Sequence, residues 1–338
     1  MSVTMRAARV PAPGAAFEIV EVPVPEPDRE QVRVAVRACG VCHTDAAFVN
    51  AGFPNLTFPL VPGHEIAGRV DAVGDGVDGW AVGDRVAVGW FGGNCGLCTC
   101  CRDGDLLHCT RLQVPGWAYP GGYAEHLVVP ASALARVPDV LQDVDAAPLS
   151  CAGVTVFNAL RHSHAKPGDL VAILGLGGLG HLGVQFAAKL GFETVAIARG
   201  RDKADLATGL GAHHVIDSDN EDVAESHQRL GGASVVLATA ANADAMSATV
   251  DGLCARGQLV VLGAVPEPIR VSPIQLVSGS RSVQGRSSGT ARDVEDTLRF
   301  AALTGVRPRV EQMPLDRAGD AFARMMSGQA RFRIVLTP

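Results

Sequence analysis

The chain has 338 residues, of which 47% are hydrophobic and 19% charged, a balance that excludes a disordered chain and can supply packed cores. Its length favours two domains. The net charge of -6, from 29 basic and 35 acidic side chains, argues against a nucleic-acid or anionic-membrane partner.

The N-terminal stretch 1–20 contains no signal-peptide core, because charged residues and prolines interrupt its apolar character. The uncharged stretch 170–188 is long enough to span a bilayer, but its five glycines favour a strand, a turn and a buried helix. We therefore expect no membrane partner and a cytoplasmic location.

The first 150 residues are rich in Val, Pro and Gly, and short alternating strands such as 31–38 and 83–89 predict an irregular all-β domain. From residue 170, β-rich runs alternate with helical stretches, which is typical of a parallel sheet. The expected strands are 170–174, 194–198, 213–217, 234–239, 258–263 and 281–285, with a crossover helix at 181–190. Helices at 293–304 and 317–327 and a strand at 333–336 complete the chain.

A glycine-rich loop follows the first of these parallel strands. The run Gly175-Leu176-Gly177-Gly178-Leu179-Gly180 has the spacing G-x-G-x-x-G and opens the crossover helix. Gly175 permits the tight turn, Gly177 lets a pyrophosphate approach the backbone, and Gly180 lets helix and strand pack closely. In this strand–loop–helix context the motif predicts a dinucleotide site.

The end of the next strand bears on which dinucleotide binds. NAD-binding proteins generally place a carboxylate there, but this strand ends in Ala198 and continues into Arg199 and Arg201. Arginine can bind a 2′-phosphate through a forked pair of hydrogen bonds, so we expect NADP(H) to be favoured over NAD(H). The alternative is that both arginines are solvated loop cations.

Nine cysteines, an odd number in a long chain, argue against a disulfide framework. Cys95, Cys98, Cys101 and Cys109 supply four thiolates at loop spacings that can close a tetrahedral, structural zinc site. An iron–sulfur cluster and free loop thiols are the alternatives. Cys100 could replace a neighbour in principle.

Three further candidate ligands lie far apart in the sequence. Cys42 lies in the run Gly40-Val41-Cys42-His43-Thr44-Asp45, His64 in Gly63-His64-Glu65, and Cys151 is isolated. Together with the four-cysteine segment and the glycine loop, all in this order, these runs resemble the zinc-dependent alcohol dehydrogenases of the medium-chain dehydrogenase/reductase superfamily. The resemblance extends essentially from end to end.

The resemblance implies an α/β fold with two domains. A GroES-like, irregular β catalytic domain would comprise 1–152 and 288–338, with its structural zinc lobe at 95–109. A Rossmann cofactor domain with a doubly wound parallel sheet would comprise 153–287. The implied activity is reversible hydride transfer between an alcohol, or an aldehyde in reverse, and NAD(P).

The resemblance also implies roles around a second, catalytic zinc. Its ligands would be Cys42, His64 and Cys151, and a fourth position would receive water or the substrate oxygen, so that zinc stabilises an alkoxide. Thr44 matches a hydroxyl that hydrogen-bonds the substrate oxygen, Asp45 a carboxylate that orients the ligand histidine, and Glu65 a carboxylate near the metal.

Further positions match family contacts to the cofactor. His43 and Arg333 match contacts to the pyrophosphate, and Thr155 matches a threonine packed against the nicotinamide. Leu262 and Ser288 resemble backbone positions that hold the carboxamide. Each could instead be a surface or packing residue.

Aromatic residues at family-equivalent positions suggest the substrate class. Phe53, Trp90 and Phe91, with Trp117 as a further candidate, would give walls suited to an apolar or aromatic primary alcohol or aldehyde, or they could be core residues. The family proton relay often ends in a histidine where this chain has Ala47, so no relay is expected beyond Thr44. The short link from Cys109 to Gly121 resembles tetrameric bacterial relatives, and we expect a homo-oligomer, a tetramer or a dimer.

Two other functions compete with this one. A zinc-free quinone or enoyl reductase of the same superfamily would lack Cys42, His64 and the four-cysteine lobe. A non-catalytic nucleotide sensor of the same fold would usually lack a catalytic ligand. Cys39, Cys100 and Cys254 receive no function and are expected to be small buried or loop residues.

Overall fold

The computed structural model describes residues 3–200 and 203–338. The chain forms two units: unit 1 is Met1–Val154 with Ser288–Pro338, and unit 2 is Thr155–Ser287. Arg201 lies outside the described residues.

Unit 1 is built on a seven-stranded, mostly antiparallel sheet in the order β14-β15-β3-β4-β5-β7, with β6 also paired to β3, and on a separate ribbon of β1 and β2. Side chains of β3 alternate between half-buried and buried over its first six residues, as expected for a strand with one face on a core. Val32, Val34 and Val36 belong to the same core cluster as Val86 and Val88 of β5. The strands are β1 Thr4–Arg9, β2 Glu18–Pro23, β3 Gln31–Val41, β4 Ile66–Val73, β5 Arg85–Val88, β6 His126–Pro130, β7 Ala135–Arg136, β14 Val310–Pro314 and β15 Arg333–Thr337.

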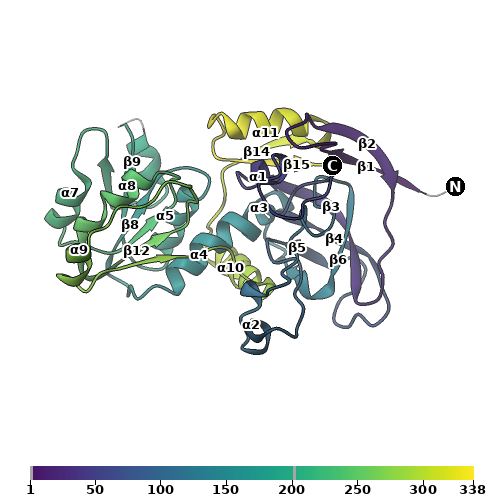
Figure 1. The fold of residues 1–338 in the computed structure, drawn as a ribbon, viewed down its shortest axis with the longest axis horizontal. Coiled ribbons are helices and arrows are strands. Elements are labelled where there is room, and N and C mark those ends of the chain that lie inside the picture. The colour runs from purple at the N-terminus through teal and green to yellow at the C-terminus, as the bar shows by residue number, and fades with distance from the viewer. Residues whose placement is uncertain (1–2, 201–202) are drawn as a thin grey trace. The chain divides into compact units, whose positions relative to one another are not determined.

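Short helices connect these strands, and two longer ones follow residue 290. Helix α10 begins after a capping box between Thr290 and Asp293 and ends at Gly305, which adopts the left-handed conformation. The segment around α2 forms a lobe that projects from the rest of unit 1 (Figure 1). The helices are α1 Asp45–Val49, α2 Thr99–Arg102, α3 Asp143–Pro148, α10 Ala291–Thr304 and α11 Ala318–Met326, with single turns η1 Leu106–His108, η2 Ala131–Ala133, η3 Leu149–Gly153 and η6 Leu315–Arg317.

Unit 2 contains a six-stranded parallel sheet in the order β10-β9-β8-β11-β12-β13. The chain starts in the middle of this sheet and proceeds first to one edge and then to the other, which is the doubly wound arrangement of the Rossmann fold. The fold class expected from the sequence is therefore confirmed for this unit. Its elements are α4 Val154–Arg161, β8 Leu170–Leu174, α5 Gly180–Lys189, β9 Glu193–Ala198, α6 Ala204–Gly209, β10 His214–Asp217, α7 Val223–Arg229, β11 Ala233–Ala238, α8 Ala243–Ser247, η5 Val250–Gly252, β12 Leu253–Val261, α9 Pro273–Val277 and β13 Ser282–Gly285.

The expected strands and helices are present, and most end points differ by at most two residues. β3 continues three residues past the expected end at 38, to Val41, and β12 differs most. That strand begins at Leu253 rather than at residue 258, and its pairing with β11 shifts register near its start. Arg256 has a positive φ of 64°, so this part of the strand is irregular and lacks the alternating pattern that predicts strands.

The stretch 170–188 forms the buried strand β8, the glycine loop and most of α5. Across the described ranges, every helix is too short or too polar to traverse a lipid bilayer.

Candidate metal centres and dinucleotide site

Four cysteines of the projecting lobe converge on one point. The sulfur atoms of Cys95, Cys98, Cys101 and Cys109 lie within 4.8 Å of one another, and that of Cys109 is 3.5 Å from that of Cys95. All are free thiols, and Cys100 is not a member of the group. Four sulfur donors at these separations fit a closed tetrahedral zinc site.

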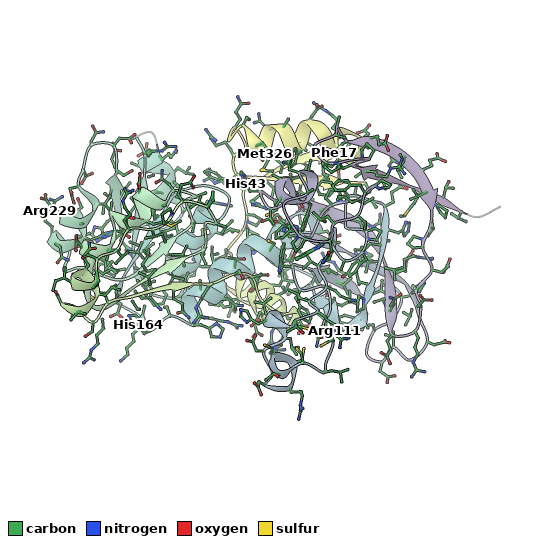
Figure 2. All side chains as sticks on the ribbon, viewed as in Figure 1. Phe17, His43, Arg111, His164, Arg229 and Met326 are labelled. Carbon is green, nitrogen blue, oxygen red and sulfur yellow. The ribbon has the colours of Figure 1, made fainter. Side chains whose placement is uncertain are left out.

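Backbone amides of the lobe stabilise the thiolate form of its cysteines. The N–H groups of Leu97 and Cys98 donate to the Cys95 sulfur at 3.5 and 3.4 Å and lower the pKa of Cys95 to about 5. The N–H of Arg111, labelled in Figure 2, donates to the Cys109 sulfur at 3.3 Å. Burial nevertheless raises the pKa of Cys109 to about 11.

A second group of possible ligands is assembled from three separate segments of unit 1. Cys42 directly follows β3, His64 and Glu65 directly precede β4, and Cys151 lies in η3. One donor atom from each of these four residues lies within 4.8 Å of the others. The structure thus brings together the three residues that the sequence predicts as ligands and adds Glu65 to the group.

Asp45 lies at the centre of the contacts behind this group. Its Oδ2 accepts hydrogen bonds from the backbone N–H of Cys42 and from the hydroxyl of Tyr123, both at 2.9 Å. Its Oδ1 lies 3.2 Å from Nδ1 of His64. Neither buried ring nitrogen of His64 has a hydrogen-bond partner among the described residues, and because Nδ1 faces Asp45, Nε2 remains available to a metal.

Glu65 and Arg333 form a buried ion pair beside the same group. The Nη2 of Arg333 donates to Oε1 of Glu65 and, at 3.3 Å, to the carbonyl oxygen of Val41. A Cβ at Gly40 would lie 2.0 Å from Oε2 of Glu65, so only glycine admits this carboxylate. In this structure Arg333, expected to contact a pyrophosphate, is only 5% exposed and faces Glu65.

Burial and mutual contact shift the pKa values of this group strongly. Contact with the Cys151 thiol lowers the pKa of Cys42 well below its usual range, and the same contact together with burial raises that of Cys151. Burial lowers the pKa of His64, but the negative charges of Asp45 and Cys42 outweigh it and leave that pKa raised. Burial raises the pKa of Glu65 to about 7, against the opposing effect of Arg333.

Aromatic rings surround His64. The Trp90 ring meets the imidazole edge-on at a centroid distance of 5.3 Å, and Phe48 does so at 5.7 Å. Phe53 lies 6.1 Å from Trp90 and 4.8 Å from Trp117. Phe91 is only 2% exposed, and its place in the substrate pocket stays a prediction. Phe48 was not among the residues predicted for the site, because in the sequence an apolar residue of α1 looks like an ordinary core residue.

The geometry of the glycine loop in unit 2 explains each glycine of the motif. Gly175 has a positive φ of 94°, and a Cβ at Gly180 would lie 1.8 Å from the carbonyl oxygen of Gly175. A Cβ at Gly177 would meet nothing within 4 Å, so the space in front of this residue is open. Thr239, which the sequence analysis missed, donates to the carbonyl oxygens of Leu174 and Gly175 and fastens the turn. This open turn before α5 fits a bound pyrophosphate.

The end of β9 is held by a carboxylate from the neighbouring strand. Asp217 pairs in register with Ala198, and its Oδ1 accepts a hydrogen bond from the N–H of Gly200 at 2.8 Å. Its Oδ2 accepts one from Asn220 at 2.7 Å. Both oxygens of Asp217 are therefore engaged within the protein, while Arg199 is exposed.

The other predicted cofactor residues are divided between the units. His43, labelled in Figure 2, is exposed in unit 1, and Ser288 is buried there with a positive φ of 49°. Thr155 and Leu262 are half-buried in unit 2, which also carries Gly178 and Leu179 of the loop. Their contacts to a cofactor stay predictions.

Known proteins share both the sequence and the fold of this chain. Residues 28–139 match the alcohol dehydrogenase GroES-like domain, and residues 178–302 match the zinc-binding dehydrogenase domain. The alcohol dehydrogenase patD of Penicillium expansum is 44% identical over 324 residues, covering 96% of this chain and 95% of the relative. An alcohol dehydrogenase of Geobacillus stearothermophilus is 39% identical over 334 residues, covering 98% of each chain. A cinnamyl alcohol dehydrogenase of Sorghum bicolor has a TM-score of 0.90 at 30% identity and covers 99% of this chain and 98% of its own.

The fold and these similarities define an oxidoreductase with a GroES-like domain and a Rossmann domain. The chain belongs to the zinc-type alcohol dehydrogenases of the medium-chain dehydrogenase/reductase superfamily.

Two neighbouring cysteines of the lobe give a matched test of the first metal centre. We expect Cys101→Ser to bind one zinc ion fewer per chain and to unfold at least about 5 °C lower, because binding of a structural metal stabilises the fold. Cys100→Ser should retain the wild-type zinc content. Elemental analysis and thermal unfolding measure both quantities, and equal zinc loss in the two variants would contradict the assignment.

Two glycines of the loop should respond differently to the same added methyl group. Gly180→Ala should destabilise unit 2 by about 1–3 kcal/mol, because the new Cβ overlaps the Gly175 carbonyl. Gly177→Ala should keep wild-type stability and bind the dinucleotide more weakly, because its Cβ occupies the open space. Thermal unfolding and titration with NADP(H) separate the effects, and a stable Gly180→Ala protein would disprove the packing argument.

Proposed function

We propose that the chain catalyses reversible hydride transfer between NADP(H) and an apolar or aromatic primary alcohol or its aldehyde, with one catalytic and one structural zinc per chain. The observation that carries this proposal is the buried group of Cys42, His64, Glu65 and Cys151, whose donor atoms lie within 4.8 Å of one another. Unit 1 would be the catalytic domain and unit 2 the cofactor domain.

The donor set of the buried group fits zinc. Two thiols that form no disulfide and one imidazole nitrogen are the ligand types that catalytic zinc sites use. When bound, zinc supplies a Lewis acid that polarises a carbonyl oxygen and lowers the pKa of an alcohol. Cys42, His64 and Cys151 would hold it, with Glu65 kept close by Arg333.

Other side chains of unit 1 would orient the reactants. Asp45 fixes the imidazole of His64 so that Nε2 points away from the carboxylate, toward the ligand position. Thr44 precedes α1 without capping it in the described structure, so its hydroxyl can hydrogen-bond the substrate oxygen. Ala47 offers no group for a longer relay, and the proton would leave Thr44 through water.

The aromatic rings around His64 support an apolar or aromatic substrate. Phe48 is fully buried, whereas Phe53 and Trp90 keep part of their surface exposed and could contact a substrate ring. A cinnamyl alcohol dehydrogenase among the similar structures acts, by its name, on an aromatic alcohol.

Arg199 supports the preference for NADP(H). The position at the end of β9 is Ala198, and the nearest strand-end carboxylate, Asp217, is occupied by Gly200 and Asn220. Among the described residues the end of β9 bears no carboxylate, and the exposed Arg199 that follows it suits a 2′-phosphate. Arg201 would assist it. The cytoplasm is the proposed location, since zinc binding requires reduced thiols.

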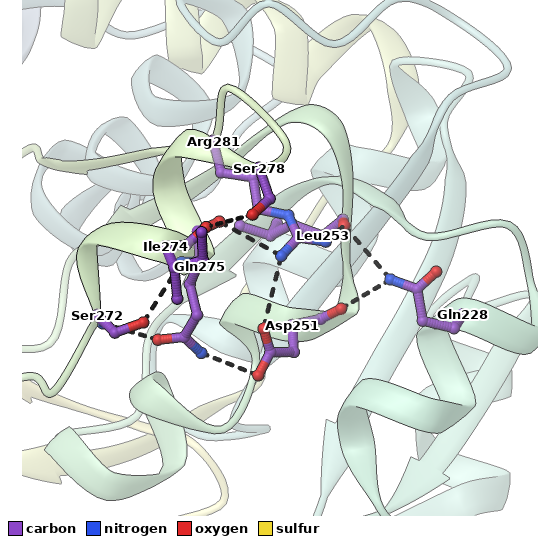
Figure 3. A network of polar contacts seen from close by, with 8 residues as sticks. All are labelled: Gln228, Asp251, Leu253, Ser272, Ile274, Gln275, Ser278 and Arg281. Atoms are coloured by element: carbon purple, nitrogen blue, oxygen red, sulfur yellow. Dashed lines mark hydrogen bonds and ion pairs between the residues drawn. The ribbon is translucent and has the colours of Figure 1, made fainter.

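An exposed sheet edge in unit 2 supports a homo-oligomer. β13 ends the six-stranded sheet and all four of its residues are exposed. Ile274, Val277 and Val283 are 68%, 76% and 38% exposed. Helix α9, which carries the first two, is held by polar contacts that include Gln275 to Asp251 at 2.9 Å and Arg281 to the Gln275 carbonyl at 3.5 Å (Figure 3). A fixed apolar edge of this kind suits pairing with a second copy.

The zinc mechanism and the cofactor preference can be tested in one assay. Reduction of an aromatic aldehyde should be faster with NADPH than with NADH and should stop when a chelator removes zinc. Arg199→Ala should lower the NADPH-to-NADH ratio of kcat/KM by about 10-fold or more, because a charge-assisted hydrogen bond is lost. Arg229→Ala, another exposed cation of unit 2, is the control.

Two results of this assay would contradict the proposal. Chelator-insensitive turnover would favour the zinc-free reductase alternative, and a wild-type preference for NADH would remove the assigned role of Arg199. Wild-type protein that binds no zinc at the buried group would favour the nucleotide-sensor alternative.

The oligomer should depend on the β13 edge. Light scattering should give the wild-type mass of a tetramer or a dimer, and Val283→Lys should reduce that mass because a charge on an edge strand opposes pairing. Val140→Lys changes a residue of unit 1 that is 68% exposed and should leave the mass unchanged. A monomeric wild-type protein would contradict the proposal.

A further inference from the structure

Tyr123 is a fully buried residue whose hydroxyl contacts Asp45, the carboxylate beside His64. It follows Gly121 and Gly122 and precedes β6, and it is among the largest side chains with less than 2% exposure. Its hydroxyl donates to Oδ2 of Asp45 at 2.9 Å, across 78 positions of sequence. A phenylalanine would fill the same apolar space, so the hydroxyl calls for a separate explanation.

The backbone and the ring of Tyr123 are fixed against the segment that leads into His64. The N–H of Tyr123 donates to the carbonyl oxygen of Pro62 at 3.0 Å, and its own carbonyl accepts from Ala8 at 2.8 Å. A Cβ at Gly63 would lie 2.5 Å from the tyrosine ring, so the ring packs directly on this backbone. The hydroxyl therefore has little freedom to move away from Asp45.

The hydroxyl is one of two donors to the same carboxylate oxygen. Oδ2 of Asp45 also accepts from the Cys42 N–H at 2.9 Å, while Oδ1 lies 3.2 Å from Nδ1 of His64. Two donors on Oδ2 fix the rotation of the carboxylate and so direct Oδ1 at the imidazole. Burial raises the pKa of Tyr123 well above its usual value, so the hydroxyl stays a donor at neutral pH.

We propose that Tyr123 is a positioning residue for the catalytic metal, which holds Asp45, and through it His64, in the orientation that binds zinc. The proposal rests on the proposed catalytic zinc at Cys42, His64 and Cys151. It differs from a packing role because the hydroxyl, rather than the ring, carries the effect. Asp45 is the direct partner of a ligand, a kind of contact that strongly influences metal affinity, and Tyr123 would act through it.

The test compares zinc release from the holoenzyme of wild type and Tyr123→Phe under excess chelator. The lobe zinc acts as an internal reference. We expect the catalytic zinc to leave about 3–10-fold faster in the variant, since the change is one contact further out than a direct partner of a ligand, and the lobe zinc to leave at the wild-type rate.

The chain offers a matched control, because Tyr119 is the other of its two tyrosines. The Tyr119 hydroxyl donates to the Gly92 carbonyl at 2.8 Å, so Tyr119→Phe also removes one hydroxyl and one hydrogen bond. Both zinc ions should leave Tyr119→Phe at wild-type rates. Equal release rates in the two variants would overturn the proposal, even if both unfold at lower temperature.

A double-mutant cycle tests whether the effect passes through Asp45. Asp45→Ala, which removes the acceptor, should alone accelerate release of the catalytic zinc, and adding Tyr123→Phe should accelerate it no further. A full additional acceleration would overturn the proposal. A wild-type protein without the catalytic zinc would instead contradict the proposed function, so the two failures are distinguishable.

A spectroscopic measurement avoids the risk that Tyr123→Phe fails to fold. With 3-fluorotyrosine at both positions, Tyr119→Phe assigns the two fluorine resonances. Removal of the catalytic zinc should move the Tyr123 resonance and leave that of Tyr119 in place. A stationary Tyr123 resonance would overturn the proposal.

Discussion

The buried carboxylate of Asp45 is the constraint on which the candidate ligand group of Cys42, His64, Glu65 and Cys151 depends. A carboxylate with no exposure to water costs several kcal/mol unless polar partners replace its hydration. Here the partners are the Cys42 backbone, the Tyr123 hydroxyl and the His64 imidazole. The contacts that compensate the buried charge of Asp45 therefore also hold two candidate ligands, Cys42 and His64. A substitution of Asp45 would disturb the positions of both.

The sheet of unit 1 brings these partners together, and glycines allow them to approach. Antiparallel pairing of β3 with β4 places Cys39 opposite Ile66, and the Gly40 N–H donates to the Glu65 carbonyl at 2.8 Å. The two ligand segments therefore meet at the end of one strand pair. A Cβ at Gly89 would lie 2.2 Å from the Ser150 carbonyl, so glycine after β5 also lets η3 deliver Cys151. Close contacts between backbone segments, more than side-chain interactions, therefore determine how near to one another the candidate ligands lie.

The sequence predicted best those features whose determinants are local. β-rich runs located the strands of unit 2, and the spacing of Gly175, Gly177 and Gly180 predicted a turn in which Gly175 has a positive φ, Gly177 faces open space and Gly180 packs on the Gly175 carbonyl. Tyr123 escaped notice because its acceptor is remote in sequence, and an aromatic after two glycines has the pattern of a core residue. The same holds for Asp217, whose bond to Gly200 depends on strand pairing. Register between strands and the direction of a single hydroxyl are tertiary properties, and no short pattern encodes them.

The two candidate metal centres illustrate this difference between local and tertiary determinants. The lobe draws all four cysteines from 95–109, and amides of the same segment, such as that of Leu97, donate to the Cys95 sulfur and lower the pKa of Cys95. Spacing alone therefore predicts it, and it can form wherever that segment folds. The buried group draws ligands from three elements and relies on charged side chains at zero or near-zero exposure. Its geometry exists only once the sheet, η3 and β15 are in place, so only the resemblance to a family could indicate it from sequence. The Tyr123 hydroxyl belongs to this second kind of arrangement, because its acceptor, Asp45, comes from a remote segment of the chain.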